Sequence, residues 1–193
     1  MDYLVYNMAA LPESLVDTSL FPPEEHAQAV LRRGKRYALI RTLLRQELSR
    51  RCSSPPQEIR FSYGPQGKPE YAAQPFNISH SGDCLCLAFH HLPIGVDVER
   101  LRPRSFSRLA ARFMSPEQLR GFMERGCPQD EFYACWCAAE ALVKHAGDTM
   151  WNALNYPFIY SHGRIICQFS PAPAIHLFTP MPGYCGAVAY TSE

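Results

Sequence analysis

The stretch PIGVDVER, residues 93–100, has the alternating pattern of a half-buried β-strand. Successive side chains of a strand point to opposite faces, so the apolar residues at 94, 96 and 98 would face a core while Asp97 and Glu99 share the other face. Two carboxylates ~7 Å apart on one face repel each other, and a cation bound between them removes that repulsion. Two interpretations stay open here: a metal site, or a solvated strand edge with two surface acids.

Composition places the chain among globular proteins. Its 193 residues suit one large domain or two small halves packed on each other, and 47% hydrophobic residues are enough for a sizeable core. The net charge of +1 gives no electrostatic case for nucleic-acid binding. We expect no membrane helix, because no apolar run approaches the ~20 residues that a span needs. The first residues lack the features of a secretory signal, so we expect a cytoplasmic protein.

The order of expected elements is the same in the two halves of the chain: helix first, then strands. A helix beginning near Pro22 is expected to continue through Gly34 to about residue 50, and capping residues at Ser115 and Gln118 mark the start of another. The remaining expected elements are a strand at 1–9, short strands over 59–83, two strands over 84–99, helices at 104–113 and 130–145, and strands after 157.

Eight cysteines include two C-x-C pairs, Cys84/Cys86 and Cys135/Cys137. Paired zinc ligands usually have two to four residues between them, so a gap of one is a weak metal signal. The first pair alternates with leucines as on a buried strand, and the second flanks a tryptophan on a helix. We therefore expect buried free thiols, with a zinc protein as the alternative.

Two further stretches carry polar groups suited to an anion. In CWCAAEALVK the residues Trp136, Glu140 and Lys144 are four apart and share one helix face, either as an exposed ion pair or as part of a mixed metal and anion site. In FNISHSGD, Ser79 and His80 offer a hydroxyl and an imidazole near a turn, and Lys68 precedes them in a Gly/Pro turn. Local hydrogen bonding or solvation would explain each alone.

The order GKP, FNISHSGD, PIGVDVER, RFMSPEQ and CWCAAEALVKHAG resembles the 4′-phosphopantetheinyl transferases, specifically the large monomeric surfactin-type class. The resemblance implies an α+β pseudo-dimer of two similar halves, 1–93 and 94–193, with the active site between them. It implies transfer of the phosphopantetheine arm of coenzyme A to a serine of an apo acyl or peptidyl carrier protein, releasing adenosine 3′,5′-bisphosphate. Neither nucleic acid nor membrane is an expected partner, and the protein is expected to be a monomer.

The same resemblance implies roles for individual residues. Asp97, Glu99 and Glu140 match the family's metal ligands, with Mg²⁺ expected and Mn²⁺ as an alternative. Lys68, Ser79 and His80 match contacts to the adenosine-bisphosphate end of coenzyme A, which an arginine at Arg32 or Arg33 would join. Lys144 matches the pyrophosphate contact, and the catalytic set is Glu140, Lys144 and Asp97. Replacing Asp97 or Glu140 by alanine is expected to abolish transfer and leave the fold intact.

Two positions depart from the family pattern. Ala139 stands where a lysine usually precedes the metal-binding glutamate, and Gln118 stands where a glutamate is usual. If the missing lysine matters to the chemistry, Ala139→Lys should raise kcat. The departures leave an alternative open, a catalytically weakened protein that binds coenzyme A or a carrier. The pathway of the carrier, whether fatty-acid, polyketide or non-ribosomal peptide, is also open.

A carrier-docking surface is expected on the segment after Pro103. Arg104, Arg108 and Arg112 recur every four residues, which would place them on one face of the expected helix. Like charges at this spacing destabilise a helix by about 0.2–0.5 kcal/mol per pair. The segment is therefore interpreted either as a docking site for an acidic carrier or as a solvated basic face with individually paired arginines.

Overall fold

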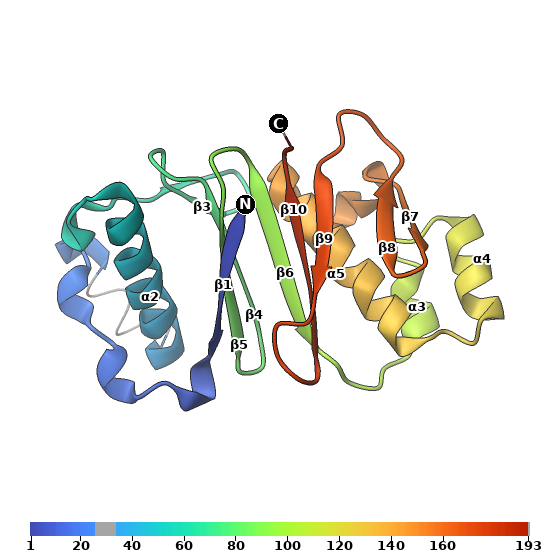
Figure 1. Ribbon diagram of the computed structural model, residues 1–193, viewed down its shortest axis with the longest axis horizontal. Coiled ribbons are helices and arrows are strands. Elements are labelled where there is room, and N and C mark those ends of the chain that lie inside the picture. The colour runs from blue at the N-terminus through green and yellow to red at the C-terminus, as the bar shows by residue number, and fades with distance from the viewer. Residues whose placement is uncertain (26–33, 193) are drawn as a thin grey trace.

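The computed structural model describes residues 1–25 and 34–192, which form two antiparallel three-stranded sheets stacked between two long helices. Figure 1 shows the layers in the order α2, first sheet, second sheet, α5. The first sheet has the strand order β1 (Asp2–Asn7), β5 (Cys84–Phe89), β4 (Phe76–Ser81). The second has the order β6 (Ile94–Arg100), β10 (Tyr184–Tyr190), β9 (Ala174–Phe178). The expected α+β class is confirmed.

Helices, two short hairpins and turns of 3₁₀ helix make up the rest of the described chain. The helices bounded within the described residues are α2 (Gly34–Cys52), α3 (Phe106–Ala110), α4 (Pro116–Glu124) and α5 (Gln129–Ala146), and residues 23–25 are also helical, as expected for a helix beginning near Pro22. Two hairpins pair β2 (Ser62–Tyr63) with β3 (Pro69–Glu70) and β7 (Phe158–Ser161) with β8 (Arg164–Cys167). Turns of 3₁₀ helix lie at Met8–Ala10, Glu13–Leu15, Thr18–Leu20, Pro56–Glu58 and Met150–Asn155. The capping box predicted at Ser115 is present, with Gln118 as its partner.

Strand β5 is buried on both faces, which explains its uninterrupted apolar sequence. Leu85, Leu87 and Phe89 pack in one core cluster with Leu44 and Leu48 of α2. The alternate residues Cys84, Cys86 and Ala88 pack in a second cluster with Ile94, Val96 and Val98 of β6. The two C-x-C pairs are buried free thiols, as expected from their pattern.

The two sheets are joined by side chains of β4 rather than by a backbone ladder. Asn77 Oδ1 accepts from the Val96 amide (2.8 Å), Ser79 Oγ from the Val98 amide (3.2 Å) and Ser81 Oγ from the Arg100 amide (3.1 Å). These amides lie on the outer edge of β6, where unpaired N–H groups would otherwise be left buried. The period of two in N-I-S-H-S therefore fastens β4 to the strand that carries Asp97 and Glu99.

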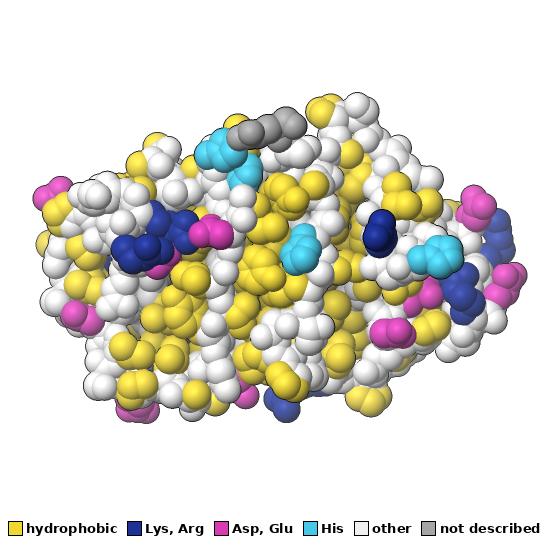
Figure 2. Space-filling view, in the orientation of Figure 1, with side chains coloured by type: hydrophobic (Ala, Val, Ile, Leu, Met, Phe, Trp, Pro, Cys, Tyr) yellow, Lys and Arg dark blue, Asp and Glu magenta, His cyan; other side chains and the backbone are white. Residues whose placement is uncertain are grey.

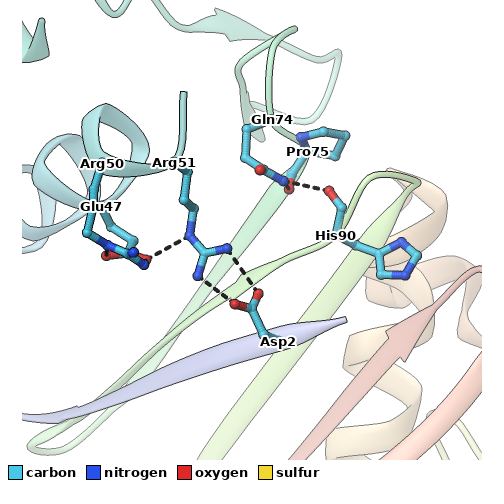
Figure 3. A network of polar contacts seen from close by, with 7 residues as sticks. All are labelled: Asp2, Glu47, Arg50, Arg51, Gln74, Pro75 and His90. Carbon is cyan, nitrogen blue, oxygen red and sulfur yellow. Dashed lines mark hydrogen bonds and ion pairs between the residues drawn. The ribbon is translucent and has the colours of Figure 1, made fainter. Parts of the chain in front are cut away.

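Helix α2 is fixed to the first sheet by an ion-pair network (Figure 3). The nearly buried Glu47 accepts from Arg50 and Arg51, and Arg51 also binds the Asp2 carboxylate of β1 at 2.7 Å. The hydrogen bond from Arg50 is the largest effect that lowers the pKa of Glu47, against the opposing effect of burial. In the same view Gln74 Nε2 donates to the His90 carbonyl at 2.7 Å, which closes the end of β5.

Two helix predictions were wrong in extent. Gly34 has φ +71°, a left-handed conformation that a continuous right-handed helix does not contain, so α2 begins there. Helix α3 spans only Phe106–Ala110, so Arg104 precedes it and Arg112 follows it. The three arginines are exposed, but they do not form a stripe on one helix. Proline at 103 and the turn after Ala110 confine the helix to less than two turns.

The face seen in Figure 2 is largely hydrophobic along its middle, over β1, β9 and β10. Tyr3 of β1, Phe178 of β9 and Met181 are partly buried and pack on the core between the sheets. The rings of Tyr3 and Phe178 are 4.4 Å apart, so the two sheets touch across this side as well. The polar side chains that join β4 to β6 lie at the opposite edges of the sheets. This contact between β4 and β6 is called the seam below, and it carries the polar groups between the sheets.

Candidate active site

Asp97 is the centre of a buried polar cluster at the seam between the sheets. The residue is 4% exposed, because α5 covers this face of β6. Asp97 Oδ1 accepts from Ser79 Oγ at 2.8 Å and from Lys144 Nζ at 2.7 Å. Asp97 Oδ2 is buried and has no hydrogen-bond partner within the part of the chain that the structure describes. A buried carboxylate oxygen without a partner is costly, and it is available to a further ligand.

Close packing of α5 on β6 brings Lys144 to Asp97. A Cβ added at Gly95 would lie 2.1 Å from the carbonyl oxygen of Ala141, so only glycine allows the helix this near. Burial alone would lower the pKa of Lys144, but Asp97 and Glu140 outweigh it and raise that pKa. The ammonium therefore stays charged next to the carboxylates.

Glu140 and Glu99 complete the acidic group. Glu140 Oε2 lies 3.9 Å from Lys144 Nζ, and Glu99 Oε2 accepts from Ser81 Oγ at 2.8 Å. Burial is the largest cause that raises the pKa of Glu140; Lys144 opposes it, and the charges of Asp97 and Glu99 add to it. Lys144 Nζ lies 2.7 Å from Asp97 and 3.9 Å from Glu140, and Glu99 follows Asp97 by two residues on β6, so the three predicted metal ligands share one neighbourhood.

The donor set fits a hard divalent cation bound together with phosphate. Mg²⁺ is commonly held by one or two carboxylates, water and substrate phosphates, rather than by a cage of protein ligands. Within the described residues no group of three or more His, Cys, Asp and Glu side chains is gathered closely enough to hold a metal by itself. The free Oδ2 of Asp97, with Glu99 and Glu140 close by, offers the oxygen ligands that such a shared site needs.

Ser79 and Lys68 are more deeply engaged in the seam than the sequence indicates. The Ser79 hydroxyl accepts from the Val98 amide and donates to Asp97, so both its roles are used within the protein. Lys68 Nζ donates to the carbonyl oxygens of Lys144 (2.7 Å) and Ile94 (3.2 Å). Burial is the first cause that lowers the pKa of Lys68, and the Lys144 charge adds to it. Both residues thus position the cluster.

His80 is exposed beside a cation that sequence reasoning missed. Arg36 of α2 donates through Nη2 to the Gly82 carbonyl, which brings its guanidinium to the β4–β5 turn. Burial of part of the imidazole lowers the pKa of His80, and the charges of Arg36 and Lys144 lower it further. The predicted Arg32, with its alternative Arg33, lies outside the described residues. Arg36 follows Arg32 by four residues in the same arginine-rich stretch of sequence, and that proximity was the available signal.

Hollows flank the loop that carries Lys68. One of about 220 Å³ is lined by residues that include Gly67, Lys68, Asn77 and Lys144. Another of about 380 Å³ is lined on the other side of Lys68 by residues that include Tyr71 and His145. Both open at the seam, so an extended ligand can lie along it and reach Lys144.

A small crevice opens on the other end of the acidic group. Its lining residues include Glu99, Arg104, Leu109 and Trp136. The Trp136 ring packs edge-on against Phe113, with 5.5 Å between ring centroids, and stacks with Phe132 at 6.0 Å. The aromatic residue of the predicted helix face is therefore part of a packed wall. Arg104 therefore lies beside a predicted metal ligand, although it is not on a helix.

The two departures from the family pattern have structural explanations. Gln118 closes the capping box with Ser115 and donates through Nε2 to the Phe158 carbonyl, so it links α4 to β7. Ala139 is 2% exposed and belongs to the hydrophobic core of the C-terminal half. Position 139 is therefore a small, apolar site in the core, and the described residues around it leave neither room nor polar partners for a longer side chain.

We expect Ala139→Lys to destabilise the protein by about 1–3 kcal/mol or more, because a longer chain overpacks the core and an ammonium is buried there. The sequence made a gain in kcat conditional on a chemical role for the missing lysine, and the burial of position 139 argues against that condition. Urea unfolding measures the change, and Ala146→Lys, at the exposed last residue of α5, is the matched control with little expected effect. Unchanged stability of the Ala139→Lys variant together with a higher kcat would contradict the burial argument.

A family model and individual relatives of known name both match this sequence, and they indicate the same family. The family model of the 4′-phosphopantetheinyl transferase superfamily matches residues 93–178. The chain is 36% identical over 156 residues to the 4′-phosphopantetheinyl transferase Sfp of Bacillus subtilis, which covers 76% of this chain and 69% of that protein. The chain belongs to the 4′-phosphopantetheinyl transferase superfamily. The resemblance stated from the sequence motifs is thereby confirmed.

Other relatives agree in name and differ in coverage. A putative 4′-phosphopantetheinyl transferase of Synechocystis is 33% identical over 130 residues, 63% of this chain and 53% of the relative. One from Haemophilus influenzae is 24% identical over 195 residues, 97% of this chain and 83% of the relative. The chain thus spans about half of the first of these superfamily members and most of the second. No helix in the described ranges is long and apolar enough to cross a membrane.

Proposed function

We propose that this superfamily member transfers the 4′-phosphopantetheine arm of coenzyme A to a serine of an apo acyl or peptidyl carrier protein. The observation that carries the proposal is the Asp97 carboxylate, with Lys144 on one oxygen and the other oxygen buried and unpartnered among the described residues. The Lys144 ammonium suits a pyrophosphate, and the unpartnered Asp97 oxygen suits the divalent cation that accompanies it. The names of the relatives support the same activity.

The proposed reaction forms one bond and breaks one. The serine oxygen attacks the phosphorus next to the pantetheine arm, and the bridging P–O bond breaks to release adenosine 3′,5′-bisphosphate. Lys144 balances charge on the pyrophosphate, and Asp97 orients Lys144. Glu140, whose pKa is raised mainly by burial, accepts the serine proton. Mg²⁺ held by Asp97, Glu99 and Glu140, or Mn²⁺ in its place, would neutralise charge on the leaving phosphate.

The proposed architecture is a monomeric pseudo-dimer with halves 1–93 and 94–193. Each half would contribute one sheet and one long helix, α2 or α5. Coenzyme A would lie along the hollows that flank Lys68, with the carrier at the crevice beside Arg104. A cytoplasmic location accords with such substrates and stays a prediction.

The alternative function is a weakened protein that binds coenzyme A or a carrier with little turnover. Structural roles of Gln118 and Ala139 make the two departures poor support for it. Incubation with apo carrier, coenzyme A and Mg²⁺, followed by mass spectrometry of the carrier, separates the two functions. A phosphopantetheine adduct is the expected result, and its absence across fatty-acid, polyketide and peptide carriers would favour the alternative.

We expect His80→Ala to raise the KM for coenzyme A about tenfold with little change in kcat, because an exposed binding contact acts equally before and in the transition state. Dephospho-coenzyme A, which lacks the 3′-phosphate, should show a smaller effect. The matched control is His176→Ala, an exposed histidine of β9. Equal losses with both substrates would place His80 away from the 3′-phosphate.

We expect the double change Arg104→Glu and Arg108→Glu to raise the KM for the carrier about tenfold at low salt, and less at high salt, because steered encounter is screened by ions. Coenzyme A binding should be nearly unchanged. The double change Arg120→Glu and Arg164→Glu reverses the same number of exposed charges elsewhere and serves as control. An unaltered carrier KM and salt dependence would locate docking on another surface.

A further inference from the structure

Two free thiols face each other behind the candidate metal ligands. Cys137 lies on α5, three residues before Glu140, and Cys185 lies on β10, where its register partner is Glu99. Cys137 Sγ is 3.6 Å from the carbonyl oxygen of Cys185, and the two thiols are also in hydrogen-bonding contact. The pair therefore connects the helix of Glu140 to the strand beside Glu99.

The approach is close because the facing residues are small. Ala187 and Ala189 share the Cys185 face of β10 and are fully buried with α5 in one core cluster. Gly95 on the neighbouring strand lets the backbone of α5 approach the sheet at Ala141, one turn after Cys137. Side chains as short as cysteine meet across such an interface, as a disulfide requires.

The two thiols differ in exposure, which gives them different roles. Cys185 is partly exposed, whereas Cys137 is fully buried. An oxidant from solvent therefore reaches Cys185 first and finds Cys137 behind it. A partly exposed thiol with a second thiol behind it is an arrangement found in cysteines that form reversible disulfides in reducing compartments.

We infer that Cys137 and Cys185 are a reversible dithiol–disulfide couple that is oxidised by peroxides and slows the reaction at the adjacent site. In the first step the Cys185 sulfur attacks hydrogen peroxide: an S–O bond forms, the O–O bond breaks and one water leaves. The Cys137 sulfur then attacks the Cys185 sulfur: the S–S bond forms, the S–O bond breaks and a second water leaves. Two thiol hydrogens are lost, and the peroxide is reduced to two waters.

The effect on the site rests on the proposed function. A disulfide shortens the sulfur–sulfur separation to ~2.05 Å, so it draws α5 and β10 together. Glu140 is less than one turn from Cys137, and Glu99 is opposite Cys185. Misplacement of reacting groups by ~1 Å costs about 10²-fold in rate. We therefore expect the oxidised protein to transfer at least about tenfold more slowly, with recovery on reduction.

The test uses the full chain, reduced and then treated with hydrogen peroxide. Peptide mass spectrometry without reductant should find a peptide cross-linked between Cys137 and Cys185, and dithiothreitol should remove it. Cys185→Ala and, separately, Cys137→Ser should lose both the cross-link and the reversible slowing. Cys167→Ala is the matched control, because Cys167 Sγ also lies against a carbonyl, that of Pro173 at 3.8 Å. That variant should behave as the unaltered protein does.

The outcomes separate this inference from the proposed function. Sulfinic acid at Cys185 without a cross-link would overturn the couple, whatever the transfer rate. A cross-link that leaves the transfer rate unchanged would overturn the control of the site. A reduced protein that transfers nothing to any carrier would refute the proposed function, and the cross-link would still decide whether the couple exists.

Discussion

Replacing Asp97 by asparagine is expected to lower kcat for transfer by about 10²- to 10³-fold, a loss of the size seen when one electrostatic contact to the transition state is removed. The amide keeps an oxygen that can accept from Ser79 and Lys144, so the seam retains its geometry. The substitution removes the negative charge with which Oδ2 could bind a metal ion. Steady-state rates with saturating coenzyme A and carrier measure the effect.

Alanine at the same position tests stability as well as activity. The sequence predicted an intact fold for Asp97→Ala, on the assumption that the carboxylate is at the surface. Asp97 is 4% exposed and binds Lys144 at 2.7 Å, so its removal leaves that ammonium, within the described residues, with only the more distant Glu140 carboxylate. Because the Lys144 side chain is still 28% exposed, we expect a loss of about 1–3 kcal/mol, below the ~3–5 kcal/mol of a fully buried pair.

Asp130→Asn and Asp130→Ala are matched controls, since Asp130 is an exposed acid in the first turn of the same helix as Lys144. Denaturant unfolding should show a small effect for both. If Asp97→Asn retained the full transfer rate, the carboxylate would be structural, and the proposed site would have to be built on Glu99 and Glu140.

Local patterns in the sequence predicted most of the fold and the composition of the site. The alternation in residues 93–100 and the four-residue spacing of Glu140 and Lys144 depend on the geometry of one strand or one helix, and the structure contains both. Gly34 shows where this reasoning fails. A glycine is compatible with either a helix interior or a left-handed turn, and packing decides between them.

Contacts between distant segments were outside the reach of sequence patterns. Period-two polar residues in β4 suggested a turn with an anion site, but their oxygens accept from backbone amides of β6, nineteen residues on. Lys68 reaches the carbonyl of Lys144, seventy-six residues away. Ala139 looked like a missing catalytic lysine until its burial was known. In each case the partner lies across a seam that no local pattern specifies.

Replacing Lys144 by methionine is expected to change metal affinity and transfer rate in opposite directions. Lys144 Nζ occupies Asp97 Oδ1 at 2.7 Å and lies 3.9 Å from Glu140 Oε2, so it competes with any cation for the same carboxylates. Its removal frees a carboxylate oxygen and deletes one positive charge. The repulsion between two unit charges ~4 Å apart is worth up to ~4 kcal/mol in a partly screened site, and a bound cation would no longer experience it. We expect Mg²⁺ to bind at least about tenfold more tightly without coenzyme A, as measured by calorimetry.

The transfer rate of the same variant should fall by about 10²- to 10³-fold, because the ammonium that balances the pyrophosphate charge is gone. A general loss of structure would weaken both properties together, so opposite signs exclude it. Lys35→Met is the matched control: Lys35 is 80% exposed and paired with Glu13, and neither property should change. Weaker Mg²⁺ binding by Lys144→Met would contradict this prediction. It would mean that the lysine holds Asp97 and Glu140 in position for the metal, and that this positioning outweighs its competition with Mg²⁺ for the same oxygens.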